Sequence, residues 1–316
     1  MQRTNTIKDQ QAIKNEVGYK MNKIKISQLT NYLFILPGLI FLMGFMVFPI
    51  VYNILLSFKN VTLMNLNGIQ EYIGWTNYQT VLKDPLFSSS FKNSILYTGL
   101  SILGQFVIGF AFALFFNLKF PGRDTMRSII LLAWMMPVVI VGTLFQWMFA
   151  GDDTGIINYI LQALGIIDEP HLWLSDTRTA LATTMIANIW VGVPFNMLIL
   201  LSGLQSIPLE LYEAAKIDGA GRIRQFFHIT LPMIRPTILI LLILGIIYTF
   251  KAFDLIIIMT GGGPVNSSMV LPFYAYQLAF DGFEFSLGAA VSTIMFVILA
   301  AIAVLYLLLM RKEEQL

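Results

Sequence analysis

Lys251 and Asp254 stand three residues apart in an otherwise apolar stretch, 237–259, that is long enough to cross a membrane as a helix. A charge inside such a span is costly and usually faces the protein interior or a water-filled cavity. On one continuous helix, residues three apart share a face and can pair. We therefore expect these two residues, with Phe250 beside them, to line a polar pathway or to form a structural ion pair; a lysine that snorkels towards the headgroups is the third option.

Other chemistry is limited by what the sequence lacks. It contains no cysteine, so thiolate nucleophiles, disulfides and thiolate metal sites are excluded. Its two histidines, His171 and His228, lie far apart in the chain, and we expect no metal site. The phosphate-binding pattern G-x-x-x-x-G-K-[ST] is absent, and the run Gly261–Gly263 lacks the lysine and is expected to form a turn. No clustered acids or histidines support a membrane enzyme.

The composition is that of a membrane protein. Hydrophobic residues make up 57% of the 316 residues and charged residues only 12%, whereas soluble domains usually carry about 25% charged residues. One soluble core cannot hide so much apolar surface, so we expect much of it to face a lipid bilayer. The net charge of +2 is too small to indicate a nucleic-acid partner.

Six apolar stretches are long enough to span a bilayer, and the expected fold class is an all-α membrane protein with six transmembrane helices. The approximate spans are 32–58, 93–117, 128–150, 179–203, 237–259 and 285–310. The predicted domains are a polar N-terminal tail at 1–30, a six-span domain at 31–312 and a short C-terminal tail at 313–316. The lysine-rich tail has no features of a cleaved secretory signal.

The distribution of basic residues predicts the orientation of the spans. Most of the 20 lysines and arginines lie in the two tails and in the loops 118–127 and 204–236, which share one side of the predicted topology. Loops rich in lysine and arginine stay in the cytoplasm. We therefore expect both termini to be cytoplasmic and the acidic loop 150–178 to lie outside.

The cytoplasmic loop 204–236 is expected to contain two short helices. Pro208 suits a first helical turn, and Asp218-Gly219 is expected to end the first helix, with Asp218 capping the next one. The second helix should run to about Ile229 and end before Pro232. On pattern alone, a solvated connector and a handle for a partner protein are about equally expected.

The same loop carries a specific motif. It reads Glu213-Ala214-Ala215, then Asp218-Gly219-Ala220, then Ile229-Thr230-Leu231-Pro232 and Pro236. Over about thirty residues this resembles the EAA motif of ABC-importer permeases, and the resemblance implies the type I importer permease fold. In that family the loop docks on a cytoplasmic ATPase, so the resemblance assigns coupling to Glu213, Ala214, Ala215, Asp218, Gly219, Ala220 and Pro232.

Further segments resemble the carbohydrate-importer permeases, specifically the partner similar to the maltose permease subunit. They are Gly74–Tyr78, Asp84–Phe87, Asn188–Asn196, Phe253–Leu255 and Thr260–Pro264, and the similarity covers roughly residues 30–310. The maltose subunit has extra N-terminal spans and a large outer domain that this sequence does not show. The chain therefore resembles the shorter, six-span members of the family.

The resemblance implies a multi-subunit importer in a bacterial or archaeal cell membrane. Its expected partners are a second, related permease subunit, two ATPase subunits and an extracytoplasmic solute-binding protein that delivers a sugar. The ATPase subunits would bind ATP and Mg²⁺, and this chain is expected to hold no cofactor and to be no enzyme. Access to the substrate would alternate between the two sides without chemical change.

The resemblance also nominates residues that contact the sugar. Aromatic faces and hydrogen-bonding groups recognise sugars, and the matching positions here are Trp190, Gly192, Phe195 and Asn196, where Gly and Pro are expected to disturb the helix. The alternative is a packing kink with Trp190 as an interfacial anchor. If Phe250, Lys251 and Asp254 line the pathway, they are expected near the family's substrate position as well.

Two other classes of transporter remain open from the sequence. The first is an ABC permease for glycerol phosphate, glycerophosphodiesters, polyamines or another polar solute, because such permeases share the coupling loop. The second is a secondary transporter driven by an ion gradient, in which Lys251 and Asp254 would form a proton relay. The sequence does not say which sugar is carried.

Overall fold

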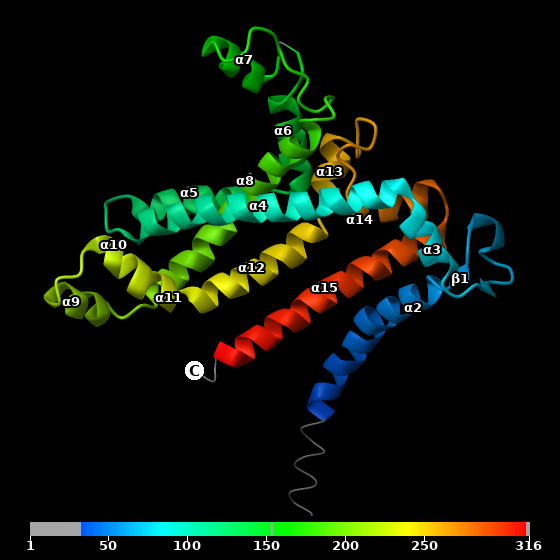
Figure 1. Ribbon diagram of the computed structural model, residues 1–316, viewed down its shortest axis with the longest axis horizontal. Helices are drawn as coiled ribbons and strands as arrows, with labels where there is room; N and C mark the ends of the chain where they lie inside the picture. The colour runs from blue at the N-terminus through cyan, green and yellow to red at the C-terminus, as the bar shows by residue number, and fades with distance from the viewer. Residues whose placement is uncertain (1–32, 153, 314–316) are drawn as a thin grey trace, which may run out of the picture. The chain divides into compact units, whose positions relative to one another are not determined.

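The computed structural model describes residues 33–152 and 154–313, which form helices with one small β-hairpin (Figure 1). The predicted N-terminal tail at 1–30 lies outside these residues, and so does the C-terminal tail except Glu313, the last residue of α15 (Phe285–Glu313). The chain divides into two compact units, Met1–Leu55 and Leu56–Leu316.

The first unit contributes one long helix, the first predicted span. Leu33–Leu56 is helical over 24 residues, with a π-helical turn at Met43–Val47 that is followed by α2 (Phe48–Leu56). At 1.5 Å per residue the helix is about 36 Å long, which exceeds the hydrocarbon thickness of about 30 Å. The sequence of this helix contains no charged residue, so it suits a lipid environment.

The second unit contains three more long apolar helices, α4 (Pro85–Asn117), α8 (Ala180–Gln205) and α15. Helix α4 starts eight residues before the predicted second span because Asp84 caps it: the Asp84 carboxylate accepts a hydrogen bond from the Leu86 amide at 2.8 Å, and Pro85 occupies the first turn. Among the described residues, four helices can cross a membrane, or six if each of two bent pairs is one span.

The predicted third span is sharply bent. Helix α5 (Arg123–Met135) and helix α6 (Val138–Met148) meet at 95°. Pro137 lacks an amide hydrogen and pushes Met136 into an extended conformation, with φ −70° and ψ 135°. The prediction of a continuous helix over 128–150 was therefore wrong, although the proline that bends it is visible in the sequence.

The predicted fifth span is also interrupted. It consists of most of α12 (Arg235–Phe250) and a separate short helix, α13 (Asp254–Met259). The helical segment Arg222–Met233 precedes α12 and meets it at 60°. No glycine or proline marks the break at 251–253. The Phe253 ring instead packs at 5.8 Å from Phe273 and 5.1 Å from Tyr276 of α14 (Leu271–Tyr276), and this aromatic contact holds the chain out of the helix.

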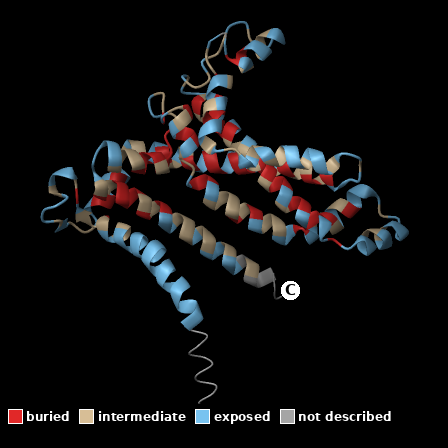
Figure 2. Cartoon of the chain, turned by 180° about the vertical axis from the view of Figure 1, so that it is seen from behind, coloured by how far each residue is buried: buried red, intermediate tan, exposed pale blue. Residues whose placement is uncertain are grey.

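Helices α4 and α8 pack closely along each other, and glycines make this approach possible. A Cβ atom on Gly104 would lie 2.6 Å from the Ile189 side chain, and one on Gly109 would lie 2.7 Å from Cβ of Asn196. A larger residue at Gly109 would push the helices apart, because it also meets the Met197 backbone amide, whereas one at Gly104 would require the Ile189 side chain to move. Figure 2 shows buried residues concentrated where the helices of this unit cross, with exposed residues on the connecting loops.

Several short elements connect the spans. Strands β1 (Lys59–Asn60) and β2 (Glu71–Tyr72) pair antiparallel and precede α3 (Thr76–Lys83). Helix α7 (Ile156–Ala163) lies in the loop between α6 and α8, and α14 leads through a π-helical turn at Gln277–Asp281 to α15. Helices α9 (Leu209–Ile217), α10 (Arg222–Gln225) and α11 (Leu231–Met233) follow α8.

Candidate functional site

Helix α9 carries the first half of the predicted coupling motif. It begins after Pro208, has Glu210 in its first turn and ends at Asp218, as predicted. Gly219 has φ +77°, a left-handed conformation that favours glycine and turns the chain. The predicted capping role of Asp218 was wrong. The residue that precedes α10 is Gly221, with no side-chain cap, because the turn places Asp218 at the end of α9 instead.

The second predicted loop helix does not end before Pro232. The chain stays helical from Arg222 through a π-helical turn at Phe226–Thr230 and on to Met233, so this helix is the first part of the bent fifth span. The wider π-helical turn explains the difference, because it accommodates the proline ring and the missing amide hydrogen within a continuous helix.

Most of the motif residues are exposed, and hydrogen bonds connect the motif to the helical segment that follows it. Glu213, Ala214, Asp218 and Gly219 are exposed, and Ala215 and Ala220 are half-buried. The hydroxyl groups of Tyr212 and Thr230 are hydrogen-bonded at 2.9 Å, and the Gln225 side-chain amide donates to the Ala220 carbonyl at 2.8 Å. These bonds connect α9 and the turn after it to the helical segment that precedes α12.

A cavity of about 560 Å³ lies between α4, α5, α6, α8 and α12. It is concave and mostly apolar with a few polar groups, as ligand sites usually are. Of the predicted pathway residues it brings together Gly192, Phe195, Asn196, Lys251 and Asp254. Its other polar or aromatic lining residues are Gln105, Trp134, Asn188, Tyr248, Thr249 and Phe253.

An amide network forms one wall of the cavity. The Gln105 side chain donates to the Asn188 carbonyl at 3.0 Å and accepts from the Asn196 side chain at 3.4 Å, and Asn196 also donates to the Gly192 carbonyl at 2.9 Å. A Cβ atom on Gly192 would lie 2.2 Å from Cδ of Gln105. Glycine is therefore required at 192 to leave space for the Gln105 amide.

Lys251 and Asp254 lie on different elements, so the prediction that they share a helix face was wrong. Lys251 follows the last residue of α12, Asp254 begins α13, and both side chains are exposed to the cavity rather than packed. In the described part of the chain the ion pairs involve Arg123, Arg127 and His171, and none joins these two residues. Nζ of Lys251 lies 5.0 Å from the centre of the Tyr248 ring, a cation–π distance.

Two predicted pathway residues do not line the cavity. Trp190 is on the surface of α8, with its ring 5.7 Å from that of Phe145. Phe250 is 5% exposed and belongs to a hydrophobic core that includes α14 and α15. The expected disturbance of the span was also wrong, because Pro194 lies within an unbroken α8.

Sequence reasoning missed Gln105, which organises the amide network. The signal was present, because Gln105 is a polar residue in the middle of the apolar stretch 93–117 and such residues usually face the protein interior. Trp134 and Tyr248 carried no comparable signal, since aromatic residues are common in membrane spans. Asn188 is notable because its side-chain nitrogen is buried without a hydrogen-bond partner among the described residues.

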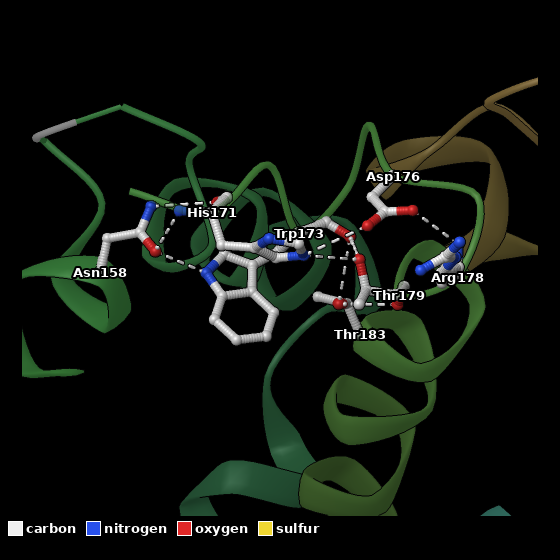
Figure 3. Close-up of polar contacts among 7 residues, drawn as sticks. All are labelled: Asn158, His171, Trp173, Asp176, Arg178, Thr179 and Thr183. Carbon is white, nitrogen blue, oxygen red and sulfur yellow. Dashed lines mark hydrogen bonds and ion pairs between the residues drawn. The ribbon is translucent and has the colours of Figure 1, made fainter. Parts of the chain in front are cut away.

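The loop 150–178, between the third and fourth spans, is held by a second polar network (Figure 3). Asn158 is fully buried, accepts from Trp173 Nε1 at 2.7 Å and from the His171 amide at 3.1 Å, and donates to the carbonyls of Ala150 and His171. Nε2 of His171 lies 3.5 Å from the Asp176 carboxylate. The network gives this loop a defined surface.

Comparison with known proteins identifies the family. Residues 105–312 match the model of the family described as "Binding-protein-dependent transport system inner membrane component". The chain belongs to this family. It is therefore the permease subunit of an ABC importer, a membrane component whose transport depends on a binding protein.

Relatives of this permease match almost its full length. The sulfoquinovosyl glycerol transport system permease protein SmoG of Agrobacterium fabrum is 34% identical, and the match covers 91% of this chain and 92% of the relative. The trehalose/maltose transport system permease protein MalF of Thermococcus litoralis is also 34% identical, with 88% and 92% covered.

Solved structures share the fold of this permease. A bacterial ABC transporter involved in the import of the acidic polysaccharide alginate has a chain that superposes with a TM-score of 0.79 at 26% identity, covering 92% of this chain and 98% of that one. The same transporter type in complex with an alginate pentasaccharide-bound periplasmic protein gives a TM-score of 0.77 at 26% identity. The coverage is 90% of this chain and 94% of that one.

Proposed function

We propose that this permease translocates a sugar or oligosaccharide that an extracytoplasmic binding protein delivers, by alternating access coupled to a separate ATPase. The observation that carries the proposal is the cavity, in which residues of α4, α8 and α12 meet beside aromatic rings and unpaired polar groups. The names of the relatives support a sugar cargo, because they include permeases for sulfoquinovosyl glycerol and for trehalose and maltose.

The cavity can recognise a hydroxyl-rich ligand. Trp134, Phe195 and Tyr248 supply aromatic faces, and Asn188, Lys251 and Asp254 supply donors and an acceptor that are not committed to each other. A buried polar group without a partner costs free energy, and a sugar hydroxyl that supplies the partner recovers it. We assign the substrate contacts to these residues and to Gly192 and Asn196, whereas Trp190 and Phe250 would act through packing.

Coupling is assigned to the exposed face of α9. Glu213 is exposed and makes no ion pair within the described residues, so its carboxylate is available to a cation of another chain. The small side chains of Ala214, Ala215 and Ala220 would let another protein approach the backbone closely. Gly219 forms the turn that follows α9. Pro232 lies in the helix that continues into the fifth span, which can carry the motion to the cavity wall.

The remaining subunits follow from this assignment. Two ATPase subunits would bind ATP and Mg²⁺ and dock on this loop and on the matching loop of a second, related permease subunit. Both termini would be cytoplasmic, which places the loop 150–178 outside, towards the binding protein. A ligand shifts the equilibrium between inward and outward access only by its difference in affinity for the two states.

The test compares two glutamates of the same helix. Glu213→Ala and Glu210→Ala are each introduced into the complete complex, reconstituted in liposomes with the binding protein and sugar. We expect Glu213→Ala to reduce ATP-dependent uptake by roughly 5- to 150-fold, the range of a coupling free energy of about 1–3 kcal/mol, while the complex still assembles. The control Glu210→Ala should remain close to wild type.

A second variant addresses the turn. Gly219→Pro cannot adopt φ +77° and loses the amide that donates to the Lys216 carbonyl at 3.0 Å. We expect the same uncoupling with normal membrane insertion. Normal uptake in both Glu213→Ala and Gly219→Pro would show that this loop is not the coupling element.

A further inference from the structure

The loop between β1 and β2, residues 61–70, presents apolar side chains to its surroundings. Met64 is 100% exposed and Ile69 is 92% exposed, and Leu63 beside Met64 is exposed as well. Residues 61–70 contain no charged side chain. Exposed apolar groups of this kind indicate contact with another protein or with a membrane.

Hydrogen bonds of two polar side chains, Asn65 and Gln70, to the loop backbone fix the shape of the loop. The Asn65 side chain accepts from the Thr62 amide at 2.7 Å and donates to the Asn60 carbonyl at 2.8 Å. The Gly68 amide donates to the Asn65 carbonyl at 3.0 Å, and the Gln70 side chain donates to the loop backbone at 3.3 Å. The outward position of Met64 and Ile69 is therefore built into the loop.

Backbone hydrogen bonds attach this loop to the start of a membrane span. The Leu63 amide donates to the Phe283 carbonyl at 3.2 Å, the Val61 amide donates to Oγ of Ser286 at 2.8 Å, and the Ser286 amide donates to the Val61 carbonyl at 3.2 Å. The span Phe285–Leu308 begins at this point. Only 17% of the residues in its apolar 18-residue stretch are buried within the chain. The loop is thus attached to the start of a span whose apolar residues are mostly not buried within the chain.

Aromatic residues next to the loop fit the same environment. Tyr72 and Trp75 are exposed, and both lie close to the Phe58 ring, at 6.2 Å and 5.1 Å between ring centres. Exposed Trp and Tyr residues are enriched at the boundary between lipid and water. Phe283, whose carbonyl accepts from the Leu63 amide, is exposed as well.

We propose that the loop 61–70 is an interfacial anchor, with Met64 and Ile69 inserted among the lipid headgroups and upper acyl chains beside the start of α15. The lack of charge and the attachment to a span favour lipid over a protein partner as the occupant. The anchor would fix the beginning of α15 relative to the bilayer while other helices move. The proposal depends on the membrane location of the family and not on the cargo.

The absence of cysteine allows a direct test. Met64→Cys, Ile69→Cys and, as a water-facing control, Lys83→Cys at the end of α3 are each labelled with an environment-sensitive fluorophore in the full complex. The unsubstituted complex, treated in the same way, gives the background from partner subunits. The complexes are placed in phosphatidylcholine–phosphatidylglycerol nanodiscs, and quenching is measured with a nitroxide near the top of the acyl chain and with aqueous iodide.

We expect blue-shifted emission at positions 64 and 69 that the lipid nitroxide quenches several-fold more than at position 83, with the reverse order for iodide. Equal iodide quenching at positions 64, 69 and 83, with no lipid quenching, would overturn the proposal. Protection from iodide that appears only when the binding protein is added would also overturn it, because the loop would then be a protein-docking surface.

Discussion

Replacing Gly192 by alanine is expected to destabilise the permease through a single contact. The new Cβ atom would lie 2.2 Å from Cδ and 2.5 Å from both amide atoms of Gln105, so the Gln105 side chain must move. Its movement breaks the hydrogen bonds to the Asn188 carbonyl and to the Asn196 side chain. Overpacking and the loss of buried hydrogen bonds each cost about 1–3 kcal/mol, and we expect about 2 kcal/mol in total because the side chain can partly relax.

The assay is the thermal midpoint of the intact complex, together with its uptake rate. With an unfolding entropy of about 2.1 cal/mol/K per residue over 316 residues, a loss of about 2 kcal/mol corresponds to a fall of about 3 °C. The matched control is Gly99→Ala in α4, a helical glycine where a Cβ atom has no neighbour within 4 Å. The control should be neutral or slightly stabilising, since alanine favours the helix over glycine by up to about 1 kcal/mol.

A double variant separates this contact from a general loss of packing. In the double variant Gln105→Ala/Gly192→Ala the clash is absent. Its loss of stability should therefore be smaller than the sum of the losses in the two single variants, by a coupling free energy of about 1–2 kcal/mol. Strict additivity, or a Gly192→Ala protein as stable as wild type, would refute the assigned contact between α4 and α8.

Three further predictions concern single residues. Lys251→Met should raise the KM of uptake about tenfold, or about 1.4 kcal/mol, by removing a cation from the cavity, whereas Lys83→Met should not; equal effects would contradict the assignment. Asn158→Ala should make the loop 150–178 sensitive to limited proteolysis, since each buried group left without a partner costs about 1–3 kcal/mol; an unchanged digestion pattern would contradict this. Tyr274 donates to Asp84, and burial with this carboxylate raises the pKa of its phenol. The stabilisation from this pair should be complete below pH about 10 and decline only as the pH rises towards the raised pKa. The difference in stability between wild type and Tyr274→Phe should follow this course, and a difference that does not decline at high pH would contradict it.

The sequence predicted the parts of the fold that depend on local patterns. Spans such as α8 and α15 are long, uniform and apolar, so length alone predicted them to within a few residues. The end of α9 followed from Gly219, whose left-handed conformation only glycine adopts easily. The proline at 137 was visible as well, but its effect was underestimated.

The parts that were missed depend on contacts between distant residues. The break after Phe250 is set by the packing of Phe253 on α14, which no local signal at 251–253 reveals. The role of Gln105 becomes clear only when its amide is seen against Gly192, because the two residues lie on different helices. Lys251 and Asp254 line one cavity, but they lie on two elements instead of one.

Uptake into liposomes tests the central claim most directly. The reconstituted complex receives sugar-loaded binding protein on the outside, with ATP and Mg²⁺ or no nucleotide on the side of α9, and a proton uncoupler is added in parallel. We predict that uptake requires the nucleotide and is unaffected by the uncoupler. Uptake that persists without ATP but collapses with the uncoupler would contradict the account and show transport driven by an ion gradient.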